Sequence, residues 1–340
     1  MINNIESTVV SSRVRLARNL AEYPFPNRLQ GKEGKEIVRA VFAAASRIHP
    51  FNLCSMDEIS ENVAQSLCDD HLISAELAAN RECGAALIDE EGEADGPRGK
   101  YSVMINEEDH LREQYIVNGL NLMLAYRKIS AVDDALSKSL RFAFDKKWGY
   151  LTACPTNLGT GLRASVMLFL PGLTRVKRMD RLIREISRLG HTVRGVYGEG
   201  SAADGYMYQI SNEVTLGVTE DYILSEVQRA VLEIVRLESF ARKNMLDADF
   251  DGVKDECMRA YGILTNCYKI SYEEFLQHIS AVKLGAAVGF VPVRDFSALD
   301  ELIAAVRPAN IGLGFDEGLS PEERDKRRAA ACRAALRISE

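Results

Sequence analysis

Residues 154–171 read CPTNLGTGLRASVMLFLP, a glycine-rich segment followed by an uninterrupted apolar run. The run at 164–171 predicts a buried strand that ends at Pro171, because proline cannot donate to a sheet ladder. The glycine-rich segment lacks the Lys-Ser or Lys-Thr pair of a phosphate-binding loop. A nucleotide enzyme of this kind must therefore neutralise phosphates with another cation, and arginine, as at Arg163, offers a bidentate fork.

Strands and helices are predicted on both sides of this stretch. Apolar periodicity and turn residues predict strands at 84–89, 100–106, 192–197 and 206–216, and helices at 116–144 and 174–189. A long helix is predicted to begin near Thr219, and the chain reads as helices from there to its end. Ser271 and Ser320 each precede a glutamate by three residues, a spacing typical of a capping box.

The chain has 340 residues, which is more than one compact core usually holds. The pattern therefore predicts two domains: a strand-rich α+β domain over residues 1–238 and a helical domain over residues 239–340.

Composition excludes several classes of protein. The formal net charge of −7 argues against nucleic acid as a direct partner. No stretch reaches the ~18 apolar residues of a membrane helix, and the N-terminus lacks a basic segment followed by an apolar run. A cytoplasmic location follows as the expectation. The seven cysteines are irregularly spaced without a C-x-x-C pair, so neither a disulfide framework nor a protein-held metal site is indicated.

Charged residues recur in four unusual strings. These are SSRVRLARN at 11–19, NEEDHLR at 106–112, CPTNLGTGLRASV at 154–166 and RGVYGEG at 194–200. A single exposed arginine is usually only solvated, and an acidic string is often a solvated strand end. The alternative is a carboxylate that projects from a strand end into a cleft, as at Glu108, or from a glycine-flanked turn, as at Glu199.

In this order, the four strings resemble the phosphagen kinase family of guanidino kinases, and most closely its bacterial protein-arginine kinases. The ending SPEERDKRRAA at 320–330 resembles the C-terminal domain of the same enzymes. The resemblance covers nearly the whole chain. It implies an antiparallel β-sheet flanked by helices, followed by an all-α C-terminal domain. It also implies ATP as the phosphoryl donor, Mg²⁺ bound through the ATP phosphates, and arginine side chains of proteins as acceptors.

The resemblance also implies site residues. The nucleotide site would consist of strand residues, a cationic cradle and one histidine: Ser11, Ser12, Arg13, Val14, Arg15, His71, Arg112, Arg163, Ala164, Ser165, Val166, Met167, Arg194, Gly195, Val196, Tyr197, Gly198 and Glu199. Glu108 and Glu199 would hold and activate the acceptor guanidinium, with Cys154 beside it. Two carboxylates suit this chemistry, because a guanidinium is protonated and must lose a proton as the N–P bond forms. Cys154 could instead be a packing residue.

Two arginines near the C-terminus, Arg324 and Arg328, are four residues apart on one predicted helix. Like charges at that spacing repel unless an anion joins them. The resemblance implies an allosteric phosphoarginine site here, made by Arg324, Asp325, Arg328 and Ala329. A solvated helix, balanced by the glutamates of its first turn, is the alternative.

The resemblance further implies a homodimer, a zinc-binding activator protein, a stress-response repressor as substrate and a Clp-type unfoldase. Two other functions stay open. One is a small-molecule guanidino kinase, although the helical domain that precedes the first string in such enzymes has no room here. The other is a catalytically inactive adaptor that only binds phosphoarginine; the presence of Glu108 and Glu199 argues against it.

Overall fold

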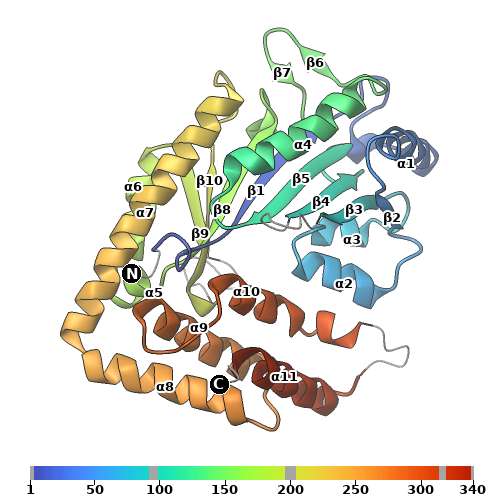
Figure 1. Cartoon of the computed structure of the whole chain (residues 1–340). Helices are drawn as coiled ribbons and strands as arrows, with labels where there is room; N and C mark the ends of the chain where they lie inside the picture. The colour runs from blue at the N-terminus through green and yellow to red at the C-terminus, as the bar shows by residue number, and fades with distance from the viewer. Residues whose placement is uncertain (1–3, 92–98, 196–203, 314–318, 338–340) are drawn as a thin grey trace.

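An eight-stranded sheet lies at the centre of the computed structural model, which describes residues 4–91, 99–195, 204–313 and 319–337 (Figure 1). Neighbouring strands pair antiparallel. In spatial order the strands are β2 (Asn52–Ser55), β3 (Ala85–Glu91), β4 (Gly99–Ile105), β5 (Leu111–Asn118), β1 (Val9–Arg18), β8 (Leu162–Phe169), β10 (Met207–Asn212) and β9 (His191–Gly195). A separate hairpin pairs β6 (Phe144–Asp145) with β7 (Gly149–Tyr150).

One set of helices covers a face of the sheet, two short helices pack against part of the opposite face, and a further group lies below the sheet in Figure 1. The helices that share the core of the sheet are α1 (Gly31–Ala45), α4 (Leu122–Ser137), α6 (Met179–Arg188) and α7 (Glu220–Ala248). The lower group has its own core and consists of α8 (Phe250–Asn266), α9 (Tyr272–Val288), α10 (Phe296–Ala305) and α11 (Pro321–Leu336). Short elements connect these parts: η1 (Pro26–Arg28), α2 (Glu61–Asp69), α3 (Ala75–Ala79), η2 (Pro155–Asn157), α5 (Pro171–Arg175), η3 (Asp204–Tyr206) and η4 (Asn310–Gly312).

Side chains of β1 alternate between the two faces of the sheet. Val14 and Leu16 are fully buried in the core that α4 covers. Arg13 and Arg15 therefore point to the opposite face, which the helices of this core leave uncovered. The same alternation in β8 places Ala164 and Val166 in this core and Arg163 on the opposite face. At the β3–β4 side of the sheet, the opposite face carries a small apolar cluster of its own, which includes Met104 and Leu72.

The predicted helix at 116–144 is wrong in its first part. Residues up to Asn118 continue β5, and Gly119 then turns the chain with φ 70. The helix α4 covers only Leu122–Ser137. The predicted helix at 174–189 is divided in two, because Lys177 adopts a left-handed φ of 55 between α5 and α6. Left-handed residues do not continue an α-helix.

Other local predictions are confirmed. Strands occupy the regions predicted at 84–89, 100–106 and 164–171. Thr219 caps α7 by accepting a hydrogen bond from the backbone N–H of Tyr222. Ser320 forms a complete capping box with Glu323, whereas Ser271 caps α9 through its own side chain.

A buried ion pair fixes α7 to the sheet. Glu238 accepts the backbone N–H groups of Gly172 and Leu173 at 2.8 Å each, at the start of α5. Arg242 donates to Glu238 at 2.7 Å and to Ser7 at 3.0 Å. Because both charges are paired and hydrogen-bonded, their burial is tolerated. The predicted domain boundary at residue 238 falls inside α7, which contributes to both cores, and it stays a prediction.

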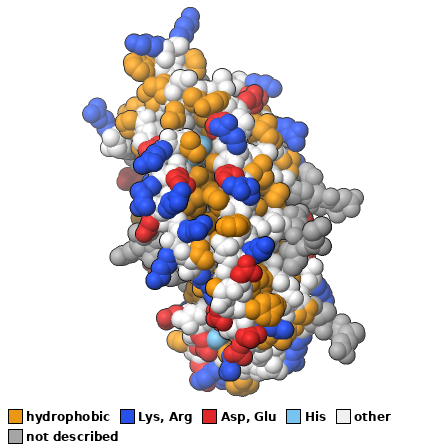
Figure 2. Space-filling model, turned by 90° about the vertical axis from the view of Figure 1, so that its left-hand side faces the viewer, with side chains coloured by type: hydrophobic (Ala, Val, Ile, Leu, Met, Phe, Trp, Pro, Cys, Tyr) orange, Lys and Arg blue, Asp and Glu red, His pale blue; other side chains and the backbone are white. Residues whose placement is uncertain are grey.

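The outer face of α7 is different, because its charges pair in solvent. Arg229 pairs with Glu226, and Arg236 pairs with Glu233 at 2.6 Å. Figure 2 views this side of the molecule and shows Lys and Arg side chains beside Asp and Glu side chains. Exposed pairs of this kind contribute little to stability.

The predicted α+β class, with an antiparallel sheet, flanking helices and a helical C-terminal region, is confirmed. None of the helices in the described part of the chain combines the length and apolar character that a membrane crossing needs.

Candidate active site

Five arginines lie on one face of the sheet, opposite the main core. They are Arg13 and Arg15 of β1, Arg112 of β5, Arg163 of β8 and Arg194 of β9. Strand register brings Arg15 directly opposite Arg163, and Ala17 opposite Arg112. The structure therefore brings together arginines that lie up to about 180 positions apart in the sequence, as the resemblance implies.

These arginines repel one another. Burial lowers the pKa of Arg15 well below its usual value, and Arg13, Arg112 and Arg163 lower it further. Burial and the charges of Arg112 and Arg163 lower the pKa of Arg13 to about 10. Burial and the charges of Arg194 and Arg112 also lower the pKa of Arg163. A cluster of cations that destabilise one another is suited to binding a polyanion.

One arginine donor has an unmet hydrogen bond. The Nε atom of Arg15 is buried and has no hydrogen-bond partner among the residues that the structure describes. Leaving a charged donor buried and unpaired is unfavourable. A phosphate oxygen would satisfy it, so the residues present fit a triphosphate.

A small pocket joins the arginines to Glu108. The pocket has a volume of about 70 Å³, and its lining is Arg15, Ala17, Glu108, Asp109, Arg112, Asn157, Gly161 and Arg163. Three cations and an exposed carboxylate thus face the same space. This is the geometry required to bring an anionic donor next to a cationic acceptor.

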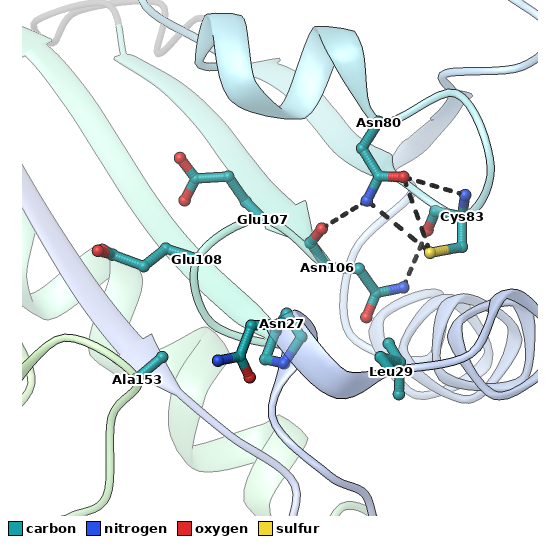
Figure 3. A pocket seen from close by; sticks show the side chains of 9 residues that line it. Asn27, Leu29, Asn80, Cys83, Asn106, Glu107, Glu108 and Ala153 are labelled. Carbon is teal, nitrogen blue, oxygen red and sulfur yellow. Dashed lines mark hydrogen bonds between the residues drawn. The ribbon is translucent and has the colours of Figure 1, made fainter.

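A second, larger pocket opens on the other side of Glu108. It has a volume of about 290 Å³, and Figure 3 shows it between η1 and the loop that follows β4. Glu107 and Glu108 direct their carboxylates to one side, away from Asn80 and Cys83. Glu108 lines both pockets, so its carboxylate borders both the larger pocket and the space that the arginines face.

The loop that carries Glu108 is held at both ends. Asn106 has a left-handed φ of 60 and donates through its side chain to the carbonyl of Cys83 at 2.9 Å. Asp109 accepts the side-chain amide of Asn19 and the backbone N–H of Ala153, both at 2.6 Å. Because Ala153 adjoins Cys154, Asp109 fixes the position of Glu108 relative to the CPTNLGTG segment.

Glu107 is a residue of the site that the sequence analysis did not assign. It accepts from Nη1 of Arg112 at 2.9 and 3.1 Å and from Ser74 at 2.7 Å. Burial opposes its charge, but Arg112 and Ser74 hold the pKa of Glu107 below its usual value. Glu107 therefore orients Arg112 rather than offering a free base. The five-residue spacing of the two in NEEDHLR could have suggested the pair.

A third pocket, of about 20 Å³, lies farther along the same face. Its lining is Ser11, Arg13, His71, Ile116, Ser165, Met167 and Gln209. Five of these seven residues were implied by the resemblance. Burial and the nearby charges of Arg13 and Arg307 lower the pKa of His71 to about 4, so its ring is neutral at pH 7. A neutral ring suits contact with a nucleotide base better than an imidazolium would.

Four of the implied nucleotide contacts point to the other face of the sheet. The side chains of Val14, Ala164 and Val166 are fully buried in the apolar core. Ser12 donates to the carbonyl of Gly119 at 2.7 Å on that same side. Strand alternation is the reason: a residue next to one that faces the cleft faces away from it. Only the main chain of these four residues can border the cleft.

Cys154 lies near Arg163. Its Sγ is 3.1 Å from Oγ1 of Thr156, and it is close enough to Arg163 to influence the pKa of that side chain. Gly195 ends β9, opposite Tyr208. Val196, Tyr197, Gly198 and Glu199 lie outside the described residues.

The C-terminal helix α11 does not present its two predicted arginines equally. Arg328 is only 2% exposed and donates to the carbonyls of Val306 at 3.1 Å and Ile270 at 2.9 Å. It also donates to Asp325 at 2.6 Å. Ala329 is fully buried, whereas Arg324 is half-buried. Arg328 therefore faces the core of the helical group, and the phosphoarginine site at Arg324, Asp325, Arg328 and Ala329 stays a prediction.

Two family models match consecutive parts of the chain. Residues 33–241 match the model described as "ATP:guanido phosphotransferase, C-terminal catalytic domain". Residues 251–340 match the model described as "Protein-arginine kinase McsB C-terminal domain".

Curated relatives match nearly the full length. A protein-arginine kinase of Halothermothrix orenii is 42% identical over 97% of this chain and 93% of its own length. A protein-arginine kinase of Geobacillus stearothermophilus is 40% identical over 97% of this chain and 90% of its own length.

Solved structures share the fold. A duplicated taurocyamine kinase from Schistosoma mansoni, with bound transition state analog components, superimposes with a TM-score of 0.61 and 28% identity. The match covers 70% of this chain and 34% of that chain. A lombricine kinase, at 24% identity and a TM-score of 0.56, covers 69% of this chain and 67% of its own and shows the fold alone.

Proposed function

The chain belongs to the ATP:guanido phosphotransferase family and, within it, to the protein-arginine kinases, and from this premise we propose how its cleft transfers the γ-phosphoryl group of ATP to arginine side chains of proteins. One observation supports the proposal most strongly. Glu108 and three arginines line a single pocket, and Glu108 also borders the larger pocket beside it. The donor phosphates belong on the arginine side and the acceptor guanidinium on the side of the larger pocket.

The arginines neutralise the transferred group. Arg15, Arg112 and Arg163 would surround the γ-phosphoryl oxygens, while Arg13 and His71 border the part of the cleft assigned to the rest of the nucleotide. Negative charge spreads over the equatorial oxygens in the transition state, so fixed cations there lower the barrier. Mg²⁺ bound to ATP would add positive charge through the phosphates.

Glu108 acts on the acceptor. It would hold the incoming guanidinium by charge-assisted hydrogen bonds and accept its proton as the N–P bond forms. The bond between the γ-phosphorus and the oxygen of the ADP leaving group breaks in the same step. Glu199 is proposed as the second carboxylate that clamps the guanidinium, on the resemblance alone.

A labelling assay tests this function. The protein is incubated with Mg²⁺ and γ-labelled ATP, together with either an unfolded arginine-rich protein or free arginine. We expect acid-labile label on the protein and little on free arginine, because the phosphoramidate bond of phosphoarginine is acid-labile. Label on free arginine alone would instead support a small-molecule kinase, and no label on either would support a non-catalytic adaptor.

We also propose a phosphoarginine site on α11. Arg324 would meet the phosphate, since Arg328 is engaged with main-chain carbonyls. Asp325 would meet the guanidinium of the ligand in competition with Arg328, its present partner at 2.6 Å.

Several finer expectations stay predictions. They concern the division at residue 238, the homodimer, the zinc-binding activator, the stress-response repressor, the Clp-type unfoldase and the cytoplasmic location. Protein substrates with accessible arginines follow from the proposed activity itself.

A further inference from the structure

The helical C-terminal group forms hydrogen bonds with the segment that precedes His71. Arg307, just after α10, donates to the carbonyl of Asp69 and to Oδ1 of Asp70 at 3.3 Å. Asn310 of η4 donates to the same oxygen of Asp70 at 2.9 Å and accepts from Ser66 at 2.5 Å. These contacts join parts of the chain more than 230 positions apart. In Figure 1 they lie where α2 faces the end of α10.

The sheet holds the same segment from the other side. Gln114 of β5 donates to the carbonyls of His71 at 2.7 Å and Leu72 at 3.2 Å. Lys100 of β4 pairs with the second oxygen of Asp70 at 3.4 Å. Between these two sets of contacts, His71 adopts a left-handed backbone with φ 59. A histidine takes this conformation at a cost, so surrounding contacts must fix it.

We propose that Arg307 and Asn310 are positioning residues for ATP: by holding Asp70, they set His71 in the nucleotide pocket beside Arg13. The inference rests on the proposed function, because it takes the pocket lined by Arg13 and His71 as the nucleotide site. It assigns to the helical group a part in forming the catalytic cleft.

A second contact between the two parts lies away from the pocket of His71. A separate ion pair crosses between them, from Arg175 of α5 to Glu256 of α8, with N–O distances of 2.8 and 2.6 Å. Arg175 also stacks on Tyr206, at 5.4 Å from its ring centroid. Neither residue lines the pocket of His71. The chain thus offers a matched control for a merely structural role.

Steady-state kinetics of protein-arginine phosphorylation tests the proposal. Arg307→Ala should raise the KM for ATP about tenfold, equivalent to about 1.4 kcal/mol, with kcat changed less than twofold. We expect KM to change more than kcat because Glu108 and Arg15, which would face the reacting groups, lie on other elements. Arg307→Lys, which keeps the charge opposite Asp70, should recover part of the affinity.

Three further variants separate the possible outcomes. Arg175→Ala should leave the KM for ATP unchanged, even where it lowers the melting temperature. Asn310→Ala is a milder change and should raise the KM about threefold; it keeps the test valid if Arg307→Ala folds poorly. Arg13→Gln should weaken ATP binding, because Arg13 lines the pocket itself.

The contradicting results are distinct. An unchanged KM in both Arg307→Ala and Asn310→Ala, with a raised KM in Arg13→Gln, would overturn the positioning role alone. An equal rise in Arg175→Ala and Arg307→Ala would also overturn it, since attachment would then suffice. Unchanged ATP binding in Arg13→Gln would remove the proposed nucleotide pocket, and the positioning role with it.

Discussion

Glu108→Gln is expected to lower kcat for protein-arginine phosphorylation by about a thousandfold while ATP binding stays near the wild-type value. Glutamine keeps the size and one acceptor oxygen of the side chain, but it cannot take the proton that the guanidinium must lose. The arginines on the other side of the shared pocket are untouched, so the donor phosphates are still held. Single-turnover rates and equilibrium ATP binding, measured on one preparation, separate the two effects.

Glu76→Gln supplies the control for this variant. Glu76 is an exposed acid on α3, outside both pockets that Glu108 lines. The Glu76→Gln variant should phosphorylate proteins at the wild-type rate. Comparable rates in wild type and Glu108→Gln would contradict the role of Glu108 as the proton acceptor. Parallel loss of ATP binding would make it a structural residue.

Arg15→Met is expected to affect activity and stability in opposite directions. The charged form of Arg15 is disfavoured in the fold by burial and by three neighbouring arginines, and its Nε has no partner in the described part of the chain. Methionine fills similar space without charge. The melting temperature without nucleotide should therefore rise by about 2 °C, while kcat/KM falls by about a hundredfold or more.

Thermal unfolding with and without ATP checks both effects of Arg15→Met. ATP should stabilise the wild type by mass action and should have almost no effect on the variant. Arg236→Met is the matched control, since Arg236 pairs with Glu233 in solvent on α7. It should leave both the ATP shift and the rate unchanged. A less stable Arg15→Met that keeps its ATP shift would contradict the phosphate role.

The order of the sequence motifs predicts the site residues more accurately than apolar periodicity predicts the helices and strands. The strings predict the five cradle arginines and Glu108. Strand register pairs Arg15 with Arg163, and Glu108 shares a pocket with three of the arginines. The sequence also indicates which side chains of β1 face the core, because Val14 and Leu16 alternate with Arg13 and Arg15. The two-residue alternation of a strand distinguishes Ser12, Val14, Ala164 and Val166 from the residues whose side chains face the cleft.

Other features depend on packing that a single sequence does not express. The apolar residues Tyr115 and Val117 fit a helix or a strand, and only their pairing with β1 and β4 decides for a strand. The contact of Arg307 with Asp70 depends on how the helical group sits against α2. Arg328 is a partial exception, since Ala329, Cys332 and Leu336 mark the buried face of α11 beside it.

The most direct test is a crystal structure with Mg²⁺, ADP, a planar anion in place of the transferred phosphoryl group, and an arginine-containing peptide. The account predicts the anion within hydrogen-bond distance of Arg15, Arg112 and Arg163, and the peptide guanidinium on the carboxylate of Glu108. A nucleotide bound away from β1 and β8, or a guanidinium that does not contact Glu108, would contradict it.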